Sequence, residues 1–153
     1  MNQSGTMRDI GKVLVAHEAQ VHSFRKNAPA VFGRSVKKLR APVFALTGGT
    51  AFTSLLSRAL VLAGAEVRWL RTVHVQADGS IECPPAMAQL GKEEIIKAEG
   101  ILVGHFLGLL VTLIGEALTL RLLSDAWPEV RSINSGAKKV LGKSRNEKTK
   151  ETR

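Results

Sequence analysis

The sequence contains no tyrosine, five phenylalanines and two tryptophans, so aromatic side chains make up only 5% of its 153 residues. A core with so few rings must be built from leucine, valine, isoleucine and alanine, a composition that favours packed helices over a β-sandwich. Cys83 is the only cysteine, which excludes an internal disulfide and fits a reducing compartment.

Motifs that carry chemistry are also missing from the sequence. His17 and His22 are five residues apart, whereas two histidines that bind one metal from a helix are four residues apart. The glycine pair within residues 47–50 lacks the Gly-Lys-Ser/Thr of a phosphate-binding loop. We therefore expect a protein that is not an enzyme and has no cofactor, no metal and no small-molecule substrate.

The first 20 residues contain no apolar stretch followed by small residues, which a cleavable signal peptide requires. We expect a cytoplasmic protein on this ground, with a membrane location as the alternative.

Positive charge is concentrated at the two ends of the chain. Residues 1–58 carry nine Lys or Arg against two acidic residues, residues 59–130 carry five against nine, and residues 131–153 carry eight against two. We expect a single helical domain over residues 1–130 and a basic, disordered tail over residues 131–153. The charge layout could join protomers or attract an anionic partner, and the alternative is solvated charge that keeps the protein soluble.

Apolar spacing in the first half of the domain predicts three helices. They cover residues 9–27, residues 29–39 and a stretch that follows the turn at 47–50 and ends near residue 63. Pro42 is expected to break the second helix, and Gly64 is expected to end the third.

The spacing of apolar residues changes twice in the second half of the domain. Residues 73–82 alternate apolar and polar side chains around an Asp-Gly turn, which indicates a small hairpin or an extended loop. The longest helical stretch then runs from residue 92 toward residue 127, with a possible break at Gly115.

Residues 101–115 within this stretch carry no formal charge. On a helical wheel the segment is apolar except for one face, so the helix must be surrounded on most sides, by protein or by lipid. A membrane span needs about 20 apolar residues, and this uncharged run is shorter. The polar face is a candidate helix-packing or dimer stripe, and it consists of Gly104, His105, Gly108, Thr112, Gly115 and Glu116.

A straight antiparallel pair of such helices would set His105 of one chain level with Glu116 of the other. The alternative is that each of these residues finds a partner within its own chain or reaches water.

The densest basic stretch lies between residues 25 and 40. It forms a candidate patch for an anionic membrane surface or nucleic acid, and the alternative is the solvated face of an amphipathic helix. The patch consists of Arg25, Lys26, Arg34, Lys37, Lys38 and Arg40.

These patterns together predict a small all-α bundle with a long apolar central helix. We expect an interaction or assembly protein that associates with itself or with a protein partner. The second hypothesis is a membrane-associated protein that uses residues 101–123 as a span or embedded helix. The third is a nucleic-acid-binding accessory protein that uses the basic N-terminal region and the tail.

Overall fold

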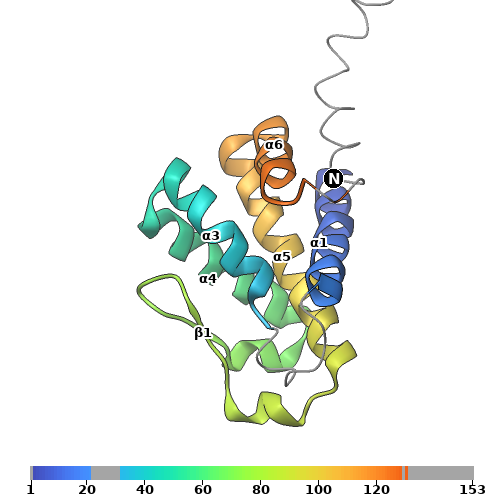
Figure 1. The fold of residues 1–153 in the computed structure, drawn as a ribbon. Helices are drawn as coiled ribbons and strands as arrows, with labels where there is room; N and C mark the ends of the chain where they lie inside the picture. Colours follow the sequence, from blue (N-terminus) through green and yellow to red (C-terminus); the bar gives the residue numbers. More distant parts are fainter. Residues whose placement is uncertain (1, 22–31, 129, 131–153) are drawn as a thin grey trace, which may run out of the picture.

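The computed structural model describes residues 2–21, 32–128 and 130 of the chain, and it confirms the small all-α class (Figure 1). Strands β1 (His74–Val75) and β2 (Ile81–Glu82) pair antiparallel and confirm a small hairpin within residues 73–82. Two short 3-10 helices, Arg68–Thr72 and Pro85–Gln89, flank the hairpin. The elements in order are α1 (Asn2–Val21), α3 (Arg34–Thr47), α4 (Gly49–Glu66), β1 (His74–Val75), β2 (Ile81–Glu82), α5 (Lys92–Ile114) and α6 (Glu116–Ala126).

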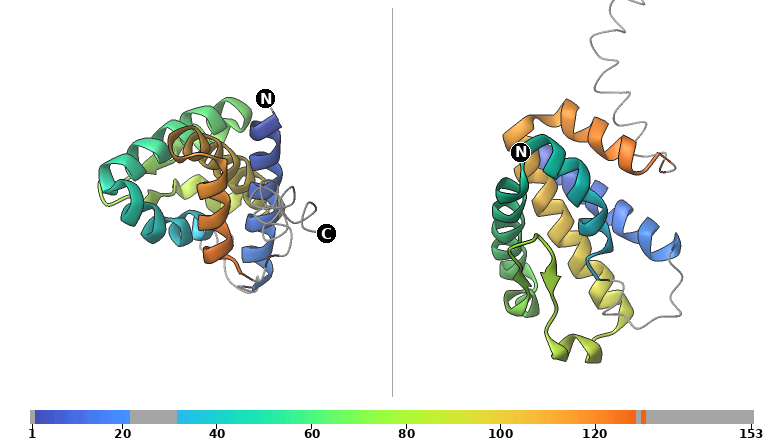
Figure 2. Two further views of the ribbon diagram at one scale, coloured as in Figure 1. Left: turned by 90° about the horizontal axis from the view of Figure 1, so that it is seen from above. Right: turned by 60° about the vertical axis from the view of Figure 1, so that its left-hand side comes forward.

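Helix α5 lies at the centre of the fold, with α1 and α4 packed along it (Figures 1 and 2). Its Leu102, Phe106 and Leu110 are fully buried, as are Leu14 of α1 and Leu56 of α4. Helices α1 and α4 therefore bury much of the central helix inside the bundle.

Glycines allow α1 to lie unusually close to α5. A Cβ atom placed on Gly11 of α1 would meet the backbone N of Gly104 at 2.7 Å and the backbone O of Gly100 at 2.9 Å. A Cβ atom on Gly104 would in turn meet the Cα of Arg8 at 3.0 Å. The contact is between backbones, so no side-chain rotation could make room for a larger residue.

The possible break at Gly115 is confirmed. Gly115 has a φ of 93°, a left-handed conformation that favours glycine, and its N–H donates to Val111 O at 2.7 Å to close the last turn of α5. Helix α6 starts at the next residue and leaves α5 in a new direction (Figure 2). The helical wheel that places Glu116 on the same stripe as His105 is therefore wrong beyond residue 114.

Pro42 does not end a helix, contrary to the sequence-based expectation. It lies within α3, which continues to Thr47. Leu39 and Val43 on either side of the proline are both fully buried. A proline inside a helix costs about 3 kcal/mol, and we attribute its tolerance to the core contacts of these two side chains.

Two predicted helix ends also differ from the structure. Helix α1 begins at Asn2 rather than at residue 9, because Met7 continues the buried face of Ile10 and Leu14 toward the N-terminus. Helix α4 runs past Gly64 to Glu66, and the Gly64 carbonyl accepts a hydrogen bond from Arg71 Nε at 3.0 Å. The predicted helix segments over residues 22–31 and the tail over residues 131–153 lie outside the described residues.

The backbone contact between α1 and α5 makes a testable prediction. Gly11→Ala should lower the free energy of unfolding by about 1–3 kcal/mol, since the new methyl group overlaps backbone atoms of α5. Gly108→Ala is the matched control, because a Cβ atom there would meet nothing within 4 Å. The control should be neutral or stabilise by up to about 1 kcal/mol through helix propensity. Urea unfolding of both variants measures the difference, and equal effects would contradict the close packing.

Candidate functional site

An apolar groove lies between α3 and α6 at the surface of the bundle. Figure 1 shows where these two helices lie. The groove encloses about 620 Å³, and most of its lining is apolar. Leu46 and Leu118 face it from opposite walls and are 51% and 40% exposed, so the groove gathers two exposed leucines in one place. The lining residues are Lys38, Pro42, Ala45, Leu46, Leu118, Arg121, Leu122, Asp125 and Ala126.

Two opposite charges on α6 border this α3–α6 groove. Arg121 and Asp125 are both exposed, lie one helical turn apart, and form no ion pair within the described part of the chain. Lys38 on the other wall is directed inward, with its Nζ 3.1 Å from a carboxylate oxygen of Glu18. The groove therefore combines exposed leucines with one positive and one negative group that the described residues leave unpaired.

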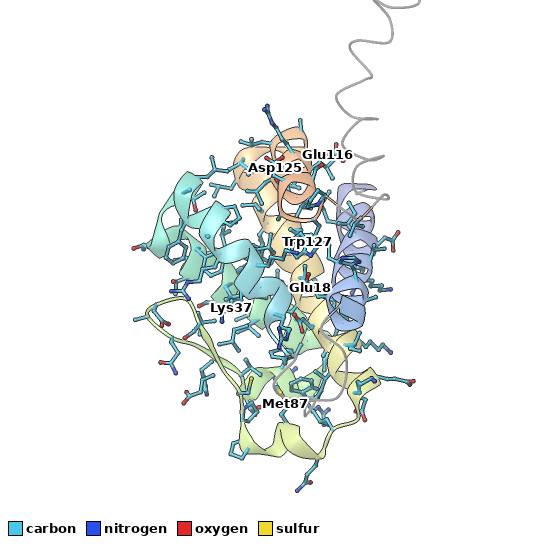
Figure 3. The ribbon with its side chains drawn as sticks, viewed as in Figure 1. Glu18, Lys37, Met87, Glu116, Asp125 and Trp127 are labelled. Atoms are coloured by element: carbon cyan, nitrogen blue, oxygen red, sulfur yellow. The ribbon has the colours of Figure 1, made fainter. Side chains whose placement is uncertain are left out.

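A buried hydrogen-bond cluster holds the end of α6 in place (Figure 3). Glu18 of α1 is only 4% exposed, and its Oε2 accepts hydrogen bonds from Trp127 Nε1 at 2.8 Å and from Lys38 Nζ at 3.1 Å. The Lys38 ammonium also lies 4.9 Å from the centre of the Trp127 ring. A buried carboxylate thus ties α6 to both α1 and α3, and both walls of the groove are fixed by it.

A second buried carboxylate, Glu99 of α5, lies at the N-terminus of α3. Its Oε2 accepts a hydrogen bond from the backbone N–H of Ser35 at 3.1 Å, so a side chain from another helix satisfies an N–H that no helical carbonyl reaches. Burial raises the pKa of Glu99 to about 7, against hydrogen bonds from Gly33 and Ser35 that lower it. Burial, and next the charge of Glu99, also raise the pKa of the Cys83 thiol, which disfavours a reactive thiolate there.

The structure places the residues of the predicted stripe on the central helix in different surroundings. Gly104 is buried against α1, whereas Gly108 has open space around it and Thr112 is exposed. Gly115 forms the break between helices, and Glu116 opens α6. The stripe therefore serves packing within the chain at Gly104 and lies at the surface at Gly108 and Thr112.

His105 has a partner inside its own chain. Its Nε2 lies 2.5 Å from Oε2 of Glu66, the last residue of α4, and the same carboxylate also pairs with Arg8. Burial and then the Arg8 charge lower the pKa of His105, which favours the neutral imidazole. The straight antiparallel pairing of His105 with Glu116 is wrong, since α5 ends before Glu116.

The predicted basic patch is spread over different surroundings. Lys37 is exposed, Lys38 reaches Glu18, and the Arg40 guanidinium lies 5.4 Å from the centre of the Phe44 ring. Arg34 is half-buried, and its Nε has no hydrogen-bond partner within the described part of the chain. The other two members of the patch, Arg25 and Lys26, lie outside the described residues.

No sequence pattern points to Glu18, Glu99 or Trp127 as residues of a site. Trp127 and Glu18 are 109 residues apart, and no local motif connects them. The available signal was weak: Glu18 lies within the predicted first helix, and Glu99 is the last charged residue before the uncharged run.

Comparison with known proteins gives no match to a protein-family model, to a curated protein or to a solved structure. Among the described residues, α5 is the one helix that is long and apolar enough to cross a membrane. Of its most apolar stretch of 18 residues, 67% is buried inside the bundle. The same residues contain no group of three or more His, Cys, Asp or Glu side chains that could hold a metal ion.

The buried Glu99 predicts a pH dependence of stability. Its pKa is about 7 in the folded protein against an ordinary 4.5, so the protonated form favours folding. The free energy of unfolding should be highest below pH 4.5, fall as the pH rises toward 7 and then level off, by a total on the order of 3 kcal/mol from this group.

Urea unfolding at several pH values measures the effect in the wild type and in Glu99→Gln. The variant cannot ionise and should lose this part of the slope, whereas Glu93→Gln, at an exposed position of the same helix, should keep it. Parallel profiles for the wild type and Glu99→Gln would contradict the assignment.

The tie between α6 and α1 makes a second prediction. Trp127→Phe keeps an aromatic ring but removes a donor to the buried Glu18 carboxylate, and should destabilise the protein by about 1–3 kcal/mol. Trp69→Phe is the control, because Trp69 is only partly buried and its Nε1 donates no hydrogen bond within the described chain. Denaturant unfolding compares the two, and an equal loss would show that the hydrogen bond is unimportant.

Proposed function

We propose that this protein is a non-enzymatic interaction protein, and that its binding surface is the α3–α6 groove. The observation that carries the proposal is the exposure of Leu46 and Leu118 on facing walls of one apolar hollow. Exposed apolar side chains gathered in this way are typical of protein-binding grooves, where a partner removes them from water.

The groove suits an amphipathic helix. Both of its walls are helices, so the partner would add a further helix to the bundle and place its own apolar residues between them. The mixed border charges, Arg121 and Asp125, would orient that helix through opposite charges on the partner. The hydrogen bonds that Glu18 accepts from Lys38 and Trp127 support this role, because a groove whose walls are held in place loses little conformational entropy on binding.

Contact with an anionic membrane is a second candidate, favoured by one observation. Two uncharged stretches, residues 41–57 and residues 100–115, both reach the end of the molecule where α3 turns into α4 and α5 turns into α6 (Figures 1 and 2). Leu113, 55% exposed, lies there as well. Because α5 directs most of its apolar surface to α1 and α4, such contact would be peripheral rather than spanning.

Position-specific cross-linking tests the proposed groove. A photoreactive phenylalanine analogue at Leu118, in the full chain and in intact cells, should yield a protein adduct. The same analogue at Val61 is the control, because Val61 is 69% exposed but lies on α4, away from the groove. Adducts only with lipid at Leu118 would favour the membrane candidate, and equal protein adducts at both positions or none at either would contradict the groove.

A further inference from the structure

We infer that the helix received by the α3–α6 groove is α6 of a second copy of this chain, running antiparallel to the first. This inference rests on the proposed function, since it names the partner of the same groove. It goes further in specifying a two-fold symmetric contact and the charged residues that set its register.

The outward side of α6 carries Leu118, Arg121 and Asp125 at spacings of three and four residues, so they form one stripe along the helix. Arg121 and Asp125 are separated by about 6 Å along the axis. A two-fold axis midway between them places each Arg121 opposite Asp125 of the other copy, because the two residues are equally far from the axis. The charges of this stripe on one copy are thus complementary to those of the same stripe on the other copy.

These two charges do not satisfy each other in the single chain. Arg121 precedes Asp125 by one turn, which is the less favourable order for an ion pair within a helix, and the described part of the chain contains no such pair. In the antiparallel dimer they would form two Arg–Asp pairs next to Leu118 and Leu122, where excluded water strengthens them.

The border charges also favour a second copy over a lipid surface. An anionic membrane would attract Arg121 but repel Asp125, whereas a symmetric partner uses both. A partner of unrelated sequence would have to supply the complementary pattern, which this chain already contains.

The contact is small. Helix α6 has 11 residues and is only about 16 Å long, so it cannot alone bury the roughly 800 Å² per partner that a stable interface needs. Pro42, Ala45 and Leu46 of α3 must add to it. We therefore expect a reversible dimer at the weak end of specific protein interfaces.

Sedimentation equilibrium of the full chain from about 1 to 100 µM tests the inference. The wild type should approach twice its 16.5 kDa mass as the concentration rises. Arg121→Asp and Asp125→Arg should each weaken the dimer by about tenfold or more, because each sets like charges opposite one another.

An equimolar mixture of these two variants should recover dimers to within about threefold of the wild type, since every altered side chain then faces one of opposite sign. Lys97→Asp is the control, because it reverses an exposed charge on α5 that does not line the groove, and should leave the dimer unchanged.

Three results would overturn the inference. They are a wild-type chain that stays monomeric over the whole range, a dimer that neither charge reversal weakens, and a mixture that fails to recover. The cross-linking at Leu118 separates these from failure of the proposed function. An adduct with a different protein there would retain the groove and exclude the second copy, whereas no protein adduct would remove both.

Discussion

The backbone contact between α1 and α5 is the constraint on which the other contacts of this fold depend. Gly11 lies so close to Gly100 and Gly104 that even one methyl group would overlap backbone atoms. This closeness brings the far end of α1, with Glu18, against α3 and the residue that follows α6. A wider separation of α1 and α5 would carry Glu18 away from Lys38 and Trp127, so the position of α6 follows from a contact between glycines elsewhere in the bundle.

Two buried carboxylates then complete a bundle that has few aromatic side chains. Glu18 keeps a cation and an indole N–H as partners, whereas Glu99 faces the start of α3 and has its pKa raised by burial. A carboxyl group perturbed in this way is often a functional site. Here the hydrogen bond from Ser35 gives Glu99 a structural role, since it satisfies a backbone N–H where α3 begins.

The sequence predicted those features that depend on local pattern. Apolar periodicity predicts the central helix, and it predicts a possible break at Gly115, which the φ of 93° at this glycine explains. Local rules failed where tertiary contacts outweigh them, as at Pro42, which the buried Leu39 and Val43 keep within a helix. The glycine stripe was recognised only in part, because spacing alone does not tell Gly104, which faces α1, from Gly108, which faces open space. The Glu18–Trp127 contact joins residues 109 positions apart and had no local signal.

The surface of α6 differs physically from the rest of the bundle. Helix α5 directs its leucines inward, because α1 and α4 enclose it, whereas α6 has α3 on one side and leaves Leu118 exposed in the hollow between them. The break at Gly115 produces this arrangement: a continuous helix would carry residues 116–126 away from α3, and the left-handed glycine turns them back across it. The residue that allows the chain to reverse is therefore also the residue that creates the groove. Because the Glu18–Trp127 hydrogen bond then holds the far end of α6 in place, the groove is already formed in the single chain, and the partner helix that we propose for it would not have to build it.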